Sequence, residues 1–205
     1  MFLSHSTASE GGHSNPPGWG RVYANLRGEH LSAPAWQDAV RSGRTFATNG
    51  PWLELDVDSN GPGALIDVTR SATLRVRAHV EGPGVEVLDV VGPDGAVATS
   101  SGLDVETDLT ITEPLWIAAV ARGPRHPSVL GPTVFAHTSP VYIDVEGRQD
   151  GRPDSARWCV DWIDRVETLA RQHGHFADDS QLRDLIDVLD RARDFYRGVG
   201  ARATA

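Results

Sequence analysis

Two residues near the start of the chain have side chains that commonly bind metals. Glu10 and His13 are separated by two glycines, in a stretch rich in Ser, Gly, His, Asn and Pro without apolar periodicity. Carboxylate and imidazole groups both ligate divalent metals, but a protein site usually takes three or more converging ligands. The residues alone therefore favour a loop over 1–18, with Glu10 and His13 as candidate metal ligands.

A second candidate combines an imidazole with two hydroxyls, because His137 directly precedes Thr138 and Ser139. A nucleophilic site needs a Ser held by a His base, with a carboxylate orienting that His. Adjacent residues of a regular strand point to opposite faces, so His137 and Thr138 would not line one pocket. We therefore expect His137 to support loops at a sheet end and not to act as a base.

Two arginines are candidates for anion binding. The guanidinium groups of Arg21 and Arg44 could recognise a carboxylate or phosphate through paired N–H donors. They could equally pair with a carboxylate of the protein or stack on Trp19 or Trp36. The residues leave both interpretations open.

The turn Asn49-Gly50-Pro51 joins a short helix to a strand. Ser32 is expected to cap the helix and Gly43 to end it, with Trp36, Ala39 and Val40 on its apolar face. In the turn, Asn49 and Gly50 can adopt positive φ at little cost, and Pro51 fixes the next φ. After the turn, apolar and polar residues alternate over 52–57, as in a half-buried strand.

Residues 52–145 show β patterns throughout. Alternation recurs at 74–81 and 103–107, and the apolar run Leu115–Val120 is typical of a central strand covered on both faces. Short strands separated by Gly, Pro and Asp turns predict an antiparallel β-sandwich. The residues expected in its core are Leu74, Val76, Val87, Ile117 and Ala119.

The pattern becomes helical after Gly147. Caps are expected at Asp154 or Ser155 and at Asp179 or Ser180, and the short connection predicts an antiparallel helical hairpin. The fold is thus mainly β with C-terminal α: loop 1–18, a β-sandwich domain with one short helix over 19–147, and a hairpin over 148–205 packed on the sandwich. Trp158, Trp162 and Phe195 or Tyr196 are expected to seat the hairpin. The expected apolar stripes are Trp158, Cys159, Trp162, Ile163, Val166, Leu169 and Ala170 on the first helix, and Leu182, Leu185, Ile186, Leu189, Ala192 and Tyr196 on the second.

Composition narrows the function classes. The 205 residues are 40% hydrophobic and 23% charged, which is typical of a soluble globular protein. A net charge of -9 argues against non-specific nucleic-acid binding, and the single Cys159 rules out an intramolecular disulfide. No apolar run approaches the roughly 18–20 residues that span a membrane, and the opening residues turn polar too soon for a signal peptide. The expectation is a protein without nucleic-acid or membrane partners, cytoplasmic by default.

Three short motifs occur in order along the chain: Gly18–Tyr23, Gly43–Pro51 and Ala136–Tyr142. Together they resemble the C-terminal region of the CehA/McbA-like metallohydrolases, the carbaryl-hydrolase relatives within the PHP superfamily. The resemblance covers nearly the whole chain, but the catalytic barrel that should precede this region is missing from it.

The resemblance implies a family that hydrolyses phosphoester, ester or carbamate bonds with a divalent metal, zinc or manganese. Glu10 and His13 stand about where the family has an Asp-x-His pair, although Glu replaces Asp and the spacing is one residue longer. Arg21 and Arg44 would bind substrate, with His137 and Asn49 in support. The missing N-terminal catalytic domain would be the partner, and a small-molecule substrate would bind only in the full enzyme.

Two functions therefore compete. The chain is either a hydrolase's accessory portion, inactive and without stably bound metal in isolation, or a free-standing β-sandwich module that binds carbohydrate or protein through exposed Trp. The sandwich fold alone does not separate them.

Overall fold

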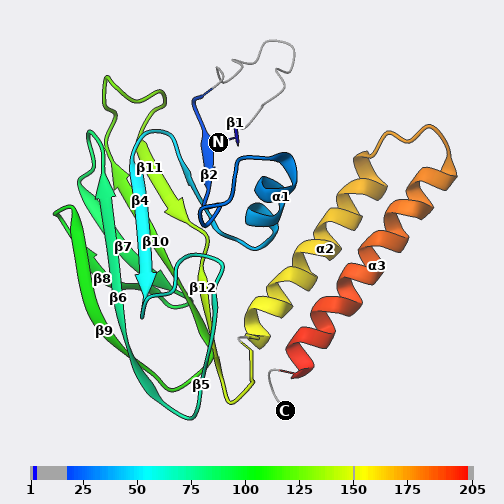
Figure 1. The fold of residues 1–205 in the computed structure, drawn as a ribbon. Coiled ribbons are helices and arrows are strands. Elements are labelled where there is room, and N and C mark those ends of the chain that lie inside the picture. Colours follow the sequence, from blue (N-terminus) through cyan, green and yellow to red (C-terminus); the bar gives the residue numbers. More distant parts are fainter. Residues whose placement is uncertain (1, 4–17, 150, 203–205) are drawn as a thin grey trace. The chain divides into compact units, whose positions relative to one another are not determined.

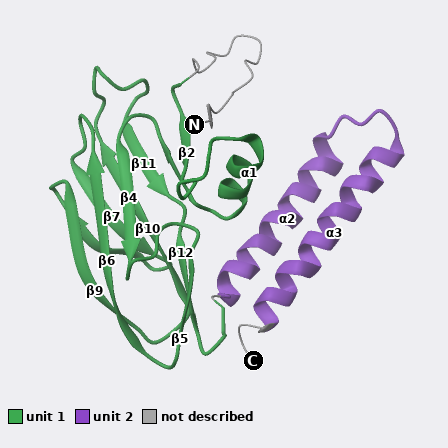
Figure 2. Ribbon diagram, in the orientation of Figure 1, with its two compact units in different colours: residues 1–149 green, residues 150–205 purple. Residues whose placement is uncertain are grey.

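The structure, a computed structural model, describes residues 2–3, 18–149 and 151–202 of the chain. Two compact units divide it, residues 1–149 and residues 150–205, coloured green and purple in Figure 2. The first is mainly β and the second is a pair of helices (Figure 1). The predicted fold class, an antiparallel β-sandwich followed by a helical hairpin, is confirmed.

The strands of the first unit form two sheets. Among the described residues, the strand pairs are antiparallel except β5 with β12. The smaller sheet has the order β4-β6-β9, with bounds Trp52–Val57, Ala72–Glu81 and Asp104–Ile111. The larger sheet has the order β1-β2-β3-β11-β10-β12-β5, and β7 and β8 extend it from β10. Its strands are β1 Phe2–Leu3, β2 Arg21–Ala24, β3 Thr45–Thr48, β5 Leu65–Val68, β7 Val87–Gly92, β8 Gly95–Ser100, β10 Leu115–Gly123, β11 Val134–Thr138 and β12 Val141–Val145.

Two short strands are not identified individually from the sequence, although the second lies within the range predicted to be β. Phe2–Leu3 pairs with Arg21 and Val22, inside a range expected to be loop. Leu65–Val68 pairs in parallel with β12. Both are short, and strands of two or four residues give too few alternations for a period to be recognised.

The core lies between the two sheets. Of the residues expected there, Leu74, Val76, Ile117 and Ala119 are buried, whereas Val87 is only half-buried. The prediction for Val87 is wrong because the inward positions of β7 are the alternate ones, Leu88 and Val90, both fully buried. β10 pairs with β7, β11 and β12, which makes it the central strand that its apolar run indicates.

Helix α1 spans Ala33–Arg41 with the predicted ends. The Ser32 hydroxyl accepts a hydrogen bond from the Ala35 backbone N–H at 3.2 Å, and Gly43 follows the helix with φ of 67°. Ala39 is buried as expected, but Val40 is exposed because its side chain is rotated about 100° from that of Ala39.

The turn between β3 and β4 does not use the positive φ that its residues can adopt. Neither Asn49 nor Gly50 has a positive φ. A Cβ placed on Gly50 would lie 2.7 Å from Val129 Cγ2, closer than van der Waals contact allows. Close packing, and not backbone conformation, is therefore what requires glycine at this position.

The second unit is a hairpin of α2, Pro153–His173, and α3, Asp179–Arg202. The predicted caps are each displaced, since α2 has its N-cap at Arg152 followed by a proline at N1. At the start of α3 the Asp178 carboxylate accepts the backbone N–H of Ser180 at 2.7 Å and of Gln181 at 3.2 Å. Within the described residues, no helix has an apolar stretch long enough to cross a membrane.

The apolar stripe predicted for α2 divides into two faces. Ala156 and Ile163 are buried, and Cys159, Val166 and Ala170 are half-buried on the same side. Trp158, Trp162 and Leu169 are instead exposed. The predicted stripe is wider than the arc that one partner helix covers, so its outer members lie beyond the α2–α3 contact. On α3 every residue of the predicted stripe is buried or half-buried.

Candidate functional site

The three motifs lie far apart in the sequence but form neighbouring strands. The first contains the start of β2, the second contains β3, and the third contains the end of β11. β3 pairs on one side with β2, through Arg21 opposite Thr48, and on the other with β11, through Thr48 opposite Ala136. The motifs therefore build one continuous corner of the larger sheet.

Asn49 links β3 to β11 in this corner through three hydrogen bonds. Its side-chain amide donates to the Thr133 carbonyl at 2.6 Å, and its side-chain oxygen accepts the Phe135 backbone N–H at 2.9 Å. Its own backbone N–H donates to the Phe135 carbonyl at 3.1 Å. A short amide side chain thus continues the β3–β11 pairing beyond the end of the strand.

The two candidate arginines have different surroundings. Arg44 donates from Nε to the Asn25 carbonyl at 3.2 Å and from a terminal nitrogen to the Asp38 carboxylate at 2.6 Å, with 11% of its side chain exposed. Arg21 makes a long hydrogen bond of 3.4 Å to the Gly50 carbonyl, and its buried Nε has no hydrogen-bond partner among the described residues. Arg44 is engaged in holding the helix to the strands, whereas Arg21 keeps donor capacity.

His137 is exposed, and its Nδ1 lies 3.3 Å from the Thr138 carbonyl. The Thr138 hydroxyl is buried and accepts the Ala119 backbone N–H at 3.0 Å, while the Ser139 hydroxyl lies 2.8 Å from that of Thr45. Each hydroxyl is thus bonded to a neighbouring strand and neither to the imidazole. The geometry is that of a sheet end and not of a Ser–His pair.

The predicted metal ligands Glu10 and His13 lie outside the described residues. Within residues 2–3, 18–149 and 151–202, no three His, Cys, Asp or Glu side chains gather in a way that could hold a metal ion. The metal site that the resemblance implies stays a prediction, and no catalytic step is assigned to the described residues.

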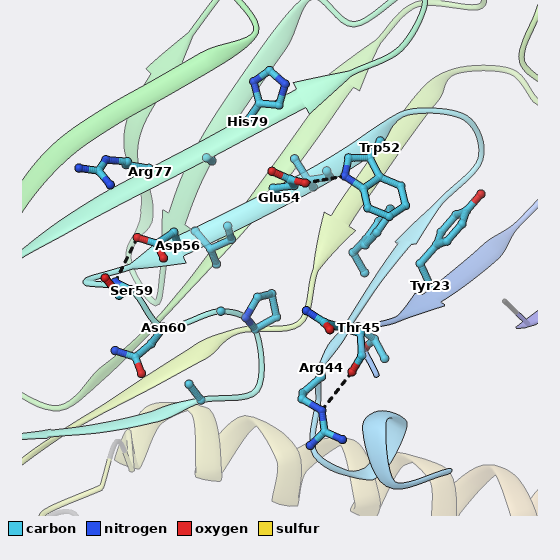
Figure 3. A pocket seen from close by; sticks show the side chains of 18 of the residues that line it. Tyr23, Arg44, Thr45, Trp52, Glu54, Asp56, Ser59, Asn60, Arg77 and His79 are labelled. Atoms are coloured by element: carbon cyan, nitrogen blue, oxygen red, sulfur yellow. Dashed lines mark hydrogen bonds between the residues drawn. The ribbon is translucent and has the colours of Figure 1, made fainter. Parts of the chain in front are cut away.

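A groove that the sequence did not predict lies on the outer face of the β4-β6-β9 sheet (Figure 3). Its volume is about 990 Å³. Residues 23–27 and 44–46 form one side, and residues 59–64 form another. We call it the Trp52 groove, after the indole ring at one end.

Trp52 is held in a cluster of three aromatic rings. Its centroid lies 5.2 Å from Tyr23 and 4.9 Å from Phe46, both edge to face, and those two rings stack on each other at 4.9 Å. The indole Nε1 donates to the Glu54 carboxylate at 2.9 Å. Even so, 44% of Trp52 is exposed.

Charged side chains cross the floor of the groove in two rows. Strand register places Glu54, His79 and Asp104 side by side in one row. The next row holds Asp56, Arg77 and Glu106, with Arg77 Nε 3.5 Å from the Glu106 carboxylate.

His79 is the titrating member of these rows. Its Nδ1 lies 2.7 Å from Asp104 and its Nε2 lies 3.4 Å from Glu81. The hydrogen bonds to Asp104 and then to Glu81 raise the pKa of His79 above its ordinary value, because both carboxylates stabilise the imidazolium.

No family model, curated protein or solved structure matches this chain.

The groove went unpredicted because its charged residues alternate with core residues, which is what any solvent-facing strand shows. One signal could have revealed it. Trp52 shares the outward parity of Glu54 and Asp56, so the sequence places a large aromatic ring on the exposed face of β4.

Proposed function

We propose that this chain is the C-terminal accessory portion of a CehA/McbA-like metal-dependent hydrolase that acts on phosphoester, ester or carbamate bonds. The observation that carries the proposal is the joining of the three family-like motifs into the neighbouring strands β2, β3 and β11. Their adjacency in one sheet supports a shared structural role for the three motifs.

The hydrogen bonding of Arg21 within the described residues, a single long bond to the Gly50 carbonyl, supports a role beside a preceding domain. Arg21 lies at the start of β2, shortly after the segment that contains Glu10 and His13. Its guanidinium is available for an anionic group of substrate, because its one hydrogen bond within the described residues is long. Arg44 is assigned instead to the scaffold, since Asn25 and Asp38 occupy its donors.

The test is to clone the coding region upstream of Met1 and express it in frame with residues 1–205. The expected product contains a His- and Asp-rich domain and hydrolyses an aryl phosphodiester or an aryl carbamate when zinc or manganese is added. In that longer protein, Arg21→Ala should lower kcat/KM by at least about tenfold. Arg27→Ala, with its exposed side chain, serves as the matched control.

Two results would contradict the proposal. One is an upstream region that encodes no metal-binding domain in frame. The other is a longer protein whose activity responds equally to Arg21→Ala and Arg27→Ala, which would leave the accessory portion without a part in substrate binding.

A further inference from the structure

The Trp52 groove has the size of a small-molecule site. Its volume of about 990 Å³ lies at the upper end of the range of roughly 300–1,000 Å³ found for ligand pockets. All of its lining residues belong to the β-sandwich unit. Tyr23 and residues 44–46, which belong to two of the three motifs, form part of its wall.

The aromatic end of the groove is a rigid platform. Contacts to Tyr23 and Phe46 and the hydrogen bond to Glu54 fix the orientation of the Trp52 ring, while nearly half of its surface stays exposed. A ring that is already ordered loses little conformational entropy when a ligand stacks on it. It also offers a large apolar contact area next to polar groups.

The polar lining presents acceptors and donors side by side. Glu54 and Asp56 supply carboxylate oxygens, and Arg77 and Asn60 supply N–H donors (Figure 3). A sugar hydroxyl both donates and accepts, so it can use both kinds of group. A ligand with only donors or only acceptors would leave half of them unpaired, which is unfavourable once water is displaced.

The charges that line the groove nearly cancel. Arg44 is paired with Asp38, Arg77 with Glu106, and His79 with Asp104. A site for a charged ligand needs an excess of the opposite charge. Glu54 and Asp56 have no cationic partner among the described residues, but each already accepts a hydrogen bond, Glu54 from the Trp52 indole and Asp56 from the Ser59 backbone N–H. The carboxylates in the lining are Glu54, Asp56, Asp104 and Glu106, and the guanidinium groups are Arg27, Arg44 and Arg77.

We propose that the Trp52 groove binds a neutral oligosaccharide, with the apolar face of one sugar ring stacked on Trp52 and the hydroxyls of neighbouring rings bonded to Glu54, Asp56, Asn60 and Arg77. The proposal goes beyond the hydrolase assignment and does not depend on it. The site belongs to the sandwich itself and binds whether or not a catalytic domain precedes it.

The experiment is isothermal titration calorimetry on the full chain with a panel of neutral tetrasaccharides: cellotetraose, xylotetraose, mannotetraose, maltotetraose and chitotetraose. At least one should bind with a dissociation constant below about 5 mM. Trp52→Ala should weaken that binding at least about tenfold. Trp158→Ala, which removes an exposed tryptophan of α2, should leave the affinity unchanged.

Charge-neutralising variants separate a neutral ligand from an ionic one. Glu54→Gln with Asp56→Asn keeps acceptor oxygens but removes both charges. A neutral sugar should still bind, though more weakly because hydrogen bonds to a carboxylate are stronger than those to an amide oxygen, whereas a cation held by the two charges should not bind. Tetramethylammonium and a sulfated tetrasaccharide are titrated in parallel as cationic and anionic probes. Binding of either ion without any neutral tetrasaccharide would overturn the proposal.

Two further outcomes would also overturn it. One is the absence of binding by every neutral tetrasaccharide at about 5 mM. The other is equal affinity in Trp52→Ala and Trp158→Ala. If Trp52→Ala fails to fold by far-ultraviolet circular dichroism, Trp52→Phe identifies the Trp52 indole N–H resonance of the wild type, and that resonance must shift when the saccharide is added.

Discussion

At the scale of single residues, the corner of the larger sheet depends on side chains that replace backbone pairing. Asn49 bonds to the Thr133 carbonyl and the Phe135 N–H where β3 ends, and Gly50 leaves room for Val129. On the opposite sheet, His79 bridges Asp104 and Glu81. Each arrangement gives a separate prediction.

Replacing Asn49 with Ala should lower the free energy of unfolding by about 1 kcal/mol, because two hydrogen bonds to the backbone of the exposed residues Thr133 and Phe135 are lost. Asn60→Ala is the matched control, since the Asn60 amide makes one local bond to the Asp58 carbonyl at 3.0 Å. Urea denaturation compares the two variants. An Asn49→Ala loss no greater than that of Asn60→Ala would contradict the bridging role.

The His79 cluster should make stability depend on pH. Its pKa is raised in the folded state, so its stabilising contribution is complete below the unfolded pKa of 6.5 and is lost as pH rises through the folded value. His79→Gln should therefore lose more stability at about pH 5.5 than at about pH 9. Because 36% of the side chain is exposed, the difference should be small and should shrink with added salt.

Urea denaturation at the two pH values measures this difference, with the exposed His30→Gln as control. The coupling to Asp104 and Glu81 is refuted if His79→Gln loses equal stability at both pH values, or more at the higher one.

At the scale of elements, β10 and α2 show how periodicity and neighbours combine. β10 is a central strand because three strands pair along its two edges. In α2 the exposed residues Trp158 and Trp162 stack on each other at 5.9 Å, and the Arg165 guanidinium lies 5.8 Å from the Trp162 ring. The apolar residues of β10 are mostly buried, whereas α2 has more apolar surface than α3 covers.

Ile117→Ala in β10 should lower the free energy of unfolding by roughly 2–5 kcal/mol, because the side chain is fully buried and its removal leaves a cavity. Leu65→Ala, at a position 60% exposed, removes a side chain of similar size and should cost far less. Chemical denaturation of both variants provides the measurement. A loss well under about 1 kcal/mol for Ile117→Ala would mean that β10 is peripheral.

At the scale of the whole molecule, the structure consists of two compact units whose chemistry differs. The sandwich contains the corner built by the three motifs and the Trp52 groove, and the hairpin has exposed aromatic side chains on its helices. Two predictions concern the whole chain. One is about the packing of the hairpin, and the other is about catalysis.

The packing of the hairpin on the sandwich stays a prediction from the sequence. Ending the chain after Gly147 should then expose apolar surface, lower the melting temperature and promote aggregation. Differential scanning calorimetry and size-exclusion chromatography compare the shortened and full chains. A monomeric sandwich with unchanged melting temperature and solubility would show that the packing is absent.

The chain of residues 1–205 should be catalytically silent with added zinc or manganese. Hydrolysis by metal-bound water requires a fixed cation with an open position, and only Glu10 and His13 stand at the family-like place. Two ligands on a loop would also lose conformational entropy on binding. The assay uses generic phosphodiesters and aryl carbamates, and metal-dependent turnover that disappears in both His13→Ala and Glu10→Gln would refute the prediction.

The sequence by itself determined the fold class, the helix ends at Ser32 and Gly43, and the burial of Leu74, Val76, Ile117 and Ala119. These features follow from local periodicity and capping, which depend on residues close together in the chain. Tertiary structure alone decided the pairing of the three motifs, the packing of Val129 against Gly50 and the existence of the Trp52 groove. Each of these features depends on which distant strands become neighbours. The alternation along a strand shows which side chains face outward, but it does not show which other segments lie beside them.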